Sequence, residues 1–88
     1  MTFLIITDDP SAGVGLAECL KERAPGSICF SMPSSAAEEA LNAVQVDCVV
    51  CPPELAEFLS RRKLPRLAVW PPEVRVEAMA EALMPHHV

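Results

Sequence analysis

Thr2-Phe3-Leu4-Ile5-Ile6-Thr7-Asp8-Asp9 begins with an apolar run and ends in two carboxylates. The run has no polar alternation, which is typical of a strand buried on both faces in the middle of a parallel sheet. Asp8 and Asp9 follow at the carboxyl end of that strand, and open α/β sheets bind their ligands at this edge. The segment therefore predicts a central strand and indicates where a site would lie.

Beyond this strand, the chain alternates predicted helices and strands. A first helix is expected from Pro10-Ser11 to about Arg23, and it is followed by strands at 27–32, 46–51 and 66–70. Each of these strands precedes a helix, at 35–44, around 55–59 and at 76–83. Four strand–helix units in succession predict one α/β domain over residues 1–88, with a parallel sheet and right-handed crossovers.

Local patterns refine these elements. Asp9 before Pro10, or Ser11, is suited to cap the first helix. Ser35-Ala36-Ala37-Glu38 has the spacing of a capping box and predicts the start of the second helix. In 27–32, apolar side chains alternate with Cys29 and Ser31, which indicates a less buried strand at a sheet edge.

Proline follows every predicted strand and limits what the carboxyl edge can bind. It stiffens the first turn of a helix but has no backbone N–H. A phosphate cradle needs glycine and free amides, so this rim is expected to be rigid and unsuited to one. The prolines concerned are Pro10, Pro33, Pro52-Pro53 and Pro71-Pro72.

Composition excludes several classes of partner. The 88 residues carry a net charge of −5, which argues against nucleic acid and against an anionic membrane surface. No apolar run approaches the length of a membrane-spanning helix, and the N-terminus has no basic leader. We therefore expect a cytoplasmic protein that binds neither nucleic acid nor membrane.

The acidic pair after the first strand and the segment Val46–Pro52 together resemble the receiver domain of two-component response regulators. The resemblance covers most of the chain by the order of its elements. It implies a flavodoxin-like fold, whose five parallel strands lie in the order 2-1-3-4-5. Because only four strand–helix units are present, we expect an open parallel sheet of about four strands, order 2-1-3-4. Helices should cover both faces, and the fifth strand should be lacking.

The resemblance also assigns positions at the carboxyl edge. The family's Mg²⁺-binding pair maps onto Asp8 and Asp9, and the Asp that begins its third strand maps onto Asp47. The phospho-accepting position falls on Pro52 and the switch Ser/Thr on Trp70, while the family's Lys has no counterpart. Proline supplies no nucleophile, so the resemblance implies a degenerate receiver, or pseudo-receiver, that cannot be phosphorylated.

The acidic pair permits two interpretations. With only two carboxylates, Asp8 and Asp9 would bind Mg²⁺ weakly, because that ion usually takes carboxylates together with phosphate oxygens. Alternatively, the pair caps helices and forms a solvated acidic rim. His86-His87 could hold a metal with Cys51 or Asp8, but the pair lacks the spacing of a metal motif.

Cysteine chemistry offers a competing function. Cys51, near Asp8 and Asp9, could serve a small thiol-dependent redox or metal-binding module. However, Cys48 and Cys51 lie three positions apart in a predicted strand, so their side chains should point to opposite faces. Neighbouring carboxylates would also raise the pKa of the Cys51 thiol. We expect the cysteines to be buried reduced thiols.

Two surfaces are candidates for partner binding. The fourth strand would be an apolar sheet edge, and the last helix brings an apolar face beside it. We expect this side to form a homodimer or to dock another protein, with Trp70 as an anchor and with Val74, Val76, Met79 and Leu83 around it. Arg61-Arg62-Lys63 is the one basic cluster; it either docks an acidic surface or is simply solvated.

These observations predict a non-catalytic module for regulatory or signalling protein–protein interaction, without a cofactor. The alternatives are the thiol module and a structural subunit of a larger complex, which would form an obligate assembly.

Overall fold

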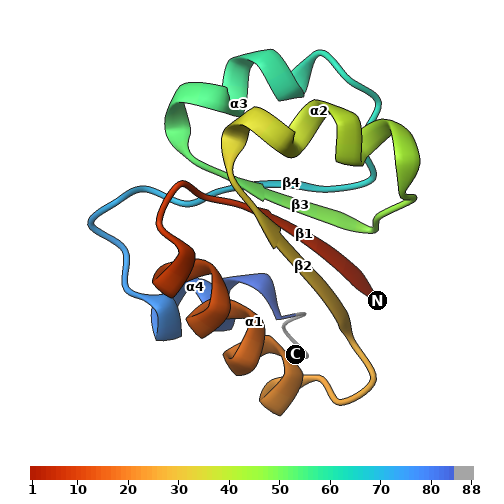
Figure 1. The fold of residues 1–88 in the computed structure, drawn as a ribbon. Coiled ribbons are helices and arrows are strands. Elements are labelled where there is room, and N and C mark those ends of the chain that lie inside the picture. The colour runs from red at the N-terminus through yellow and green to blue at the C-terminus, as the bar shows by residue number, and fades with distance from the viewer. Residues whose placement is uncertain (85–88) are drawn as a thin grey trace.

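Four parallel strands form one sheet in the order β2-β1-β3-β4, as the computed structural model of the chain shows for residues 1–84 (Figure 1). The predicted α/β class, the four strands and their order are confirmed, and the order is that of the flavodoxin-like folds. None of the helices in residues 1–84 is long and apolar enough to cross a membrane. In chain order the elements are β1 (Thr2–Ile6), α1 (Pro10–Arg23), β2 (Ile28–Met32), α2 (Ser34–Ala43), β3 (Cys48–Cys51), α3 (Pro53–Ser60), β4 (Leu67–Val69) and α4 (Val76–Leu83).

The two central strands form the centre of the protein. Residues 3–6 of β1 and all four residues of β3 are at most 1 % exposed. Their register pairs Phe3 with Cys48 and Leu4 with Val49. Alternate side chains of both strands therefore enter opposite faces of the sheet. The continuous apolar runs are thus explained by burial on both faces.

Connection handedness decides which face each helix covers. The chain moves one way across the sheet from β1 to β2 and the other way from β2 to β3 and β4. Right-handed crossovers then place α1 on one face and α2 and α3 on the other. No strand follows α4 within residues 1–84, and α4 lies beside α1 (Figure 1). We call the two sides the α1/α4 face and the α2/α3 face.

Each face has its own core. The α1/α4 core contains Phe3, Ile5, Leu16, Leu20, Cys48, Val50, Met79, Ala80 and Leu83. The α2/α3 core contains Leu4, Ile6, Ala37, Val46, Val49, Cys51 and Leu59. Helix α1 approaches β2 closely at Gly13, because a Cβ there would collide with the Ser31 side chain. Glycine at this position lets the long helix lie down on the sheet.

Several expected boundaries differ from the structure by one or two residues. β3 begins at Cys48, two residues later than expected. Just before it, the Asp47 Oδ2 accepts a hydrogen bond from Thr2 N at 2.8 Å. β4 is limited to three residues. The capping box at Ser35 is wrong, since α2 begins one residue earlier and Pro33 occupies the cap position without a side-chain hydrogen bond.

Candidate binding site at the carboxyl edge of the sheet

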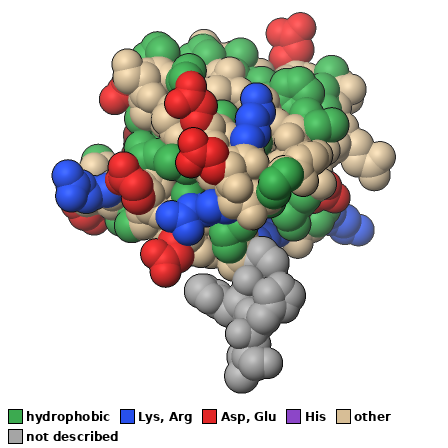
Figure 2. Space-filling view, turned by 90° about the horizontal axis from the view of Figure 1, so that it is seen from below, with side chains coloured by type: hydrophobic (Ala, Val, Ile, Leu, Met, Phe, Trp, Pro, Cys, Tyr) green, Lys and Arg blue, Asp and Glu red, His purple; other side chains and the backbone are tan. Residues whose placement is uncertain are grey.

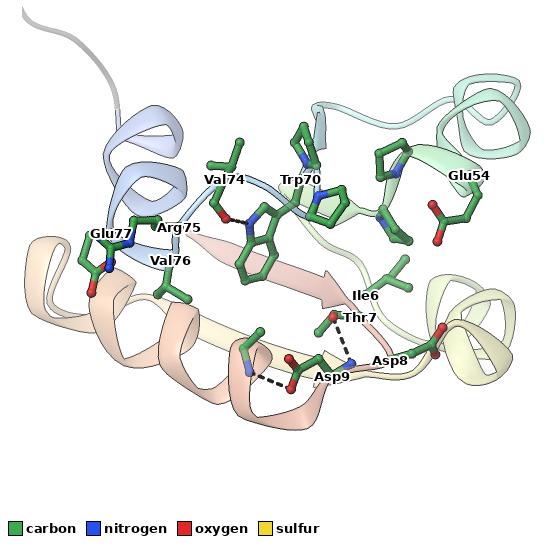
Figure 3. A pocket seen from close by; sticks show the side chains of 15 residues that line it. Ile6, Thr7, Asp8, Asp9, Glu54, Trp70, Val74, Arg75, Val76 and Glu77 are labelled. Carbon is green, nitrogen blue, oxygen red and sulfur yellow. Dashed lines mark hydrogen bonds between the residues drawn. The ribbon is translucent and has the colours of Figure 1, made fainter.

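A cavity of about 580 Å³ lies at the carboxyl ends of β1, β3 and β4. Its lining comes from the exits of these strands and from the segment that leads into α4 (Figure 3). The edge predicted from the first strand therefore does hold a cavity. The lining consists of residues 6–9, 12, 52–54, 70–72 and 74–77.

Trp70 projects its indole into the middle of this cavity (Figure 3). Its backbone N–H donates to the Cys51 carbonyl at 2.8 Å, which extends the pairing of β4 with β3. Its indole Nε1 donates to the Val74 carbonyl at 2.9 Å. Trp70 is thus held by hydrogen bonds at its backbone N–H and at its indole nitrogen. It packs, partly buried, against the α1/α4 core. Trp70, Val74 and Val76, all predicted as interaction residues, are brought together in the lining.

Asp9 caps helix α1. Its Oδ1 accepts hydrogen bonds from Ser11 N at 3.1 Å and from Ala12 N at 3.3 Å. Asp9 N in turn donates to Thr7 Oγ1 at 3.2 Å. The predicted cap is confirmed, and Pro10 stands at the first helical position. The carboxylate satisfies amides that have no partner within the helix.

Asp8 holds the start of α2, which lies on the other face. Its Oδ1 accepts from Ser34 N at 3.0 Å, and both carboxylate oxygens contact Ser34 Oγ at 3.1 Å. Sequence reasoning did not find this contact, although a serine directly after Pro33 marks a helix start. The acidic pair therefore anchors two helices on opposite faces of the sheet.

The carboxylates of Asp8 and Asp9 are already engaged within the protein. Both carboxylates already accept hydrogen bonds from helix starts, and Mg²⁺ needs near-octahedral oxygen ligation. Within residues 1–84, no group of three or more His, Cys, Asp or Glu side chains could hold a metal ion. Weak Mg²⁺ binding at Asp8 and Asp9 stays an untested prediction. The site suggested for His86-His87 lies outside the described residues.

The end of β3 carries Pro52, the residue that the resemblance matches to the phospho-accepting Asp of receivers. Pro52 lines the cavity at the cap position of α3. Asp47, the other position matched to the family, lies at the opposite end of β3 and binds Thr2 N. Glu54 is the only acid that α3 contributes to the lining. At this edge, Asp8 and Asp9 are held by hydrogen bonds, and Pro52 beside them has no nucleophilic side chain.

Cys51 lies in the interior beside this cavity. Its side chain is 0 % exposed within the α2/α3 core, whereas Cys48 is 0 % exposed within the α1/α4 core. The expectation of opposite faces is confirmed. Burial raises the pKa of the Cys51 thiol, and the nearby Glu54 charge raises it further. A buried thiol with a raised pKa is a poor nucleophile at neutral pH.

Part of the predicted interaction surface lies inside the protein. Met79 and Leu83 are 4 % and 1 % exposed, because they pack against α1 and the sheet. The expectation that they present a docking surface is therefore wrong. The Arg66 guanidinium donates to the carbonyls of Leu83 and Ala82 at 2.9 and 3.3 Å and ties the end of α4 to β4.

The basic cluster is partly engaged by its neighbours. Arg61 forms an exposed ion pair with Glu57 at 3.6 Å, and Arg62 donates to Asn42 Oδ1 at 2.7 Å. The second contact joins the end of α3 to α2. Lys63 is exposed. A docking role for Arg61-Arg62-Lys63 stays a prediction.

Comparisons of the chain with models of protein families, with curated proteins and with solved structures found no match. The site is therefore interpreted from its own geometry. Its lining includes apolar surface from Trp70 and four prolines, bordered by Asp8, Asp9, Glu54, Glu77 and Arg75. Chemically, this arrangement can bind a side chain or a short segment, and among residues 1–84 its lining contains no Cys, His, Lys or Ser for covalent chemistry.

Proposed function

We propose that this chain is a cytoplasmic, non-catalytic binding module of receiver-like design, which acts in regulation through a protein partner and not through phosphotransfer. The observation that carries the proposal is the cavity at the carboxyl edge, where a tethered Trp70 and prolines stand beside Asp8 and Asp9. Phosphotransfer to a receiver requires a carboxylate nucleophile and a metal at this edge. The resemblance to receivers matches Pro52 to the nucleophile's position, and both carboxylates accept hydrogen bonds from helix starts.

The charge of the cavity suggests what the partner presents. Four carboxylates and one guanidinium border the apolar lining, so a basic segment complements the rim. An aromatic ring held in a rigid pocket is a frequent anchor of protein interfaces, and it also attracts cations. The proposed occupant is an apolar side chain flanked by Arg or Lys on a partner protein.

A peptide titration tests the binding site. Trp70 is the only tryptophan, so its fluorescence reports on the cavity directly. We expect an end-blocked Arg-Leu-Arg peptide to change this fluorescence saturably, and a Glu-Leu-Glu peptide of equal size to leave it unchanged. Equal responses to both peptides, or no response to either, would count against a basic partner at this site.

The loss of phosphotransfer is tested by restoring the carboxylate. The variant Pro52→Asp places an acid at the cap position of α3, where Asp is favourable. We expect calorimetry to detect Mg²⁺ binding to Pro52→Asp but not to the wild type or to Pro53→Asp. Acetyl phosphate with Mg²⁺ should leave no phosphoryl adduct on the wild type by mass spectrometry. An adduct on the wild-type chain would refute the proposal.

A further inference from the structure

The two edges of the sheet are protected unequally. β4 has only three residues, with Pro65 before it and Pro71-Pro72 after it. Short edge strands and prolines discourage pairing with another strand. β2, at the other edge, has five residues and contains neither proline nor a charged side chain. Among residues 1–84, no further strand pairs with β2 on its outer side, and α1 packs against one face of this strand (Figure 1).

The outer side of β2 carries backbone groups that can pair. Ile28 N donates to the Met1 carbonyl, and the Met32 carbonyl accepts from Thr7 N, both at 2.9 Å. Residues 28, 30 and 32 thus turn their backbone groups toward β1. In a strand, the intervening residues Cys29 and Ser31 then turn theirs away from the sheet. The backbone N–H and C=O groups of these two residues can therefore pair with another strand.

Apolar side chains accompany this edge. Ile28 is 54 % exposed and Phe30 is 39 % exposed. Phe30 is in register with Leu4, so both side chains point to the α2/α3 face. Helix α2 has ten residues, of which only Ala37 is buried. Met32 of β2 packs against the α2/α3 core, whereas Ile28 and Phe30 stay exposed on this face.

We propose that β2 pairs antiparallel with β2 of a second copy of this chain, about a two-fold axis at Phe30. The residue types of β2 are symmetric about Phe30. Its two neighbours, Cys29 and Ser31, are small, and the next residues on either side, Ile28 and Met32, are large and apolar. A two-fold contact requires such self-complementarity. It places Phe30 against the partner's Phe30, and Ile28 against the partner's Met32.

The same axis satisfies the free backbone groups. Cys29 lies opposite the partner's Ser31, and residues at such a position exchange both of their N–H···O bonds. The two sheets join into one continuous sheet. Each chain carries a net charge of −5, so two copies repel, and an uncharged strand gives them a neutral contact. Salt should therefore strengthen the dimer by screening that repulsion.

Sedimentation equilibrium of the full chain, from low micromolar to near-millimolar concentration, tests this proposal. We expect a reversible dimer whose dissociation constant rises roughly tenfold or more in Phe30→Lys, since a charge at a paired edge blocks pairing. Phe58→Lys is the matched control, because Phe58 is 51 % exposed on α3, away from this edge. Circular dichroism verifies that both variants fold.

Cross-linking fixes the register. Residues at a hydrogen-bonded antiparallel position have Cα atoms about 5.5 Å apart, within the range for a disulfide. Under oxidation, Ser31→Cys should therefore form a covalent dimer through Cys29, and Cys29→Ser/Ser31→Cys should not. A wild-type chain that stays monomeric throughout overturns the proposal. So does a dimer unaffected by Phe30→Lys, or one that only Phe58→Lys dissociates.

Discussion

The two faces of the sheet carry two helices each, yet they use their apolar side chains differently. On the α1/α4 face, a 14-residue helix and the apolar side of α4 enclose nine core residues. On the α2/α3 face, helices of ten and eight residues enclose seven. The shorter helices cover the outer strands only in part. Met32 of β2 and Leu67 of β4 pack against the α2/α3 core, whereas Phe30 and Val69, which point to the same face, are exposed.

This difference shows where binding capacity remains. Apolar surface that is buried within the chain cannot contact a partner. The apolar side of α4 is buried in this way against α1 and the sheet. The outward side of that face shows charged side chains of both signs interspersed with hydrophobic ones (Figure 2). The α2/α3 face keeps Ile28, Phe30 and Phe58 exposed. Exposed apolar side chains that could meet a partner are therefore found on the α2/α3 face as well as at the cavity beside Trp70.

The largest expected effect is on stability and separates the two cores directly. Leu20→Ala on α1 removes a fully buried side chain and should cost about 2–5 kcal/mol of unfolding free energy. Leu41→Ala on α2 removes a partly buried side chain and should cost less, because some of its surface already contacts water in the folded protein. Urea denaturation followed by circular dichroism measures both. Equal losses would mean that the two faces contribute alike.

A smaller effect is expected at the acidic pair, which anchors one helix on each face. Asp9→Ala and Asp8→Ala each remove hydrogen bonds at a helix start and should each cost about 1 kcal/mol. The local consequences should differ, because α1 is held by Leu16 and Leu20, whereas α2 fully buries only Ala37.

Hydrogen exchange distinguishes the two variants. In Asp8→Ala the amides throughout α2 should exchange faster, and in Asp9→Ala only those in the first turn of α1 should do so. The matched variant Ser34→Ala loses the hydroxyl contacts but keeps the backbone N–H bond to Asp8, so it should reproduce part of the effect of Asp8→Ala. Adding Ser34→Ala to Asp8→Ala should then cost little more. Fully additive losses would show that the Asp8–Ser34 contact does not act as a unit.

The fold could be read from the sequence because its signals are local. Residues 3–6 and Cys48–Cys51 are continuous apolar runs, and only burial on both faces explains such runs in a parallel sheet. The alternation in β2 correctly placed it at an edge. Asp9 beside Pro10 is likewise a signal within one turn of the chain, and its cap was predicted correctly.

What the sequence did not reveal depends on distant parts of the chain. The contact of Asp8 with Ser34 joins residues 26 positions apart, and no periodicity encodes it. The spacing of Met79 and Leu83 shows that α4 has an apolar side. The same pattern arises whether that side is covered by the chain itself or by a partner. Only the placement of α4 beside α1 decides between the two.

The smallest expected effect is on the pH dependence of stability. It comes from one buried thiol on each face and is absent at neutral pH. Burial raises the pKa of Cys48 and of Cys51 above the ordinary value of 9.0. Above that value the unfolded chain loses the thiol protons while the folded chain keeps them, which favours unfolding. Stability should therefore be unaffected at pH 7 and should fall as pH rises past 9. Urea midpoints measured from pH 7 to 10 should decline less steeply in Cys48→Ala and Cys51→Ala than in the wild type.

Alkylation at pH 7 should modify the partly exposed Cys19 and Cys29 well before Cys51. A Cys51 that is alkylated as fast as Cys19 would instead support the thiol-dependent function.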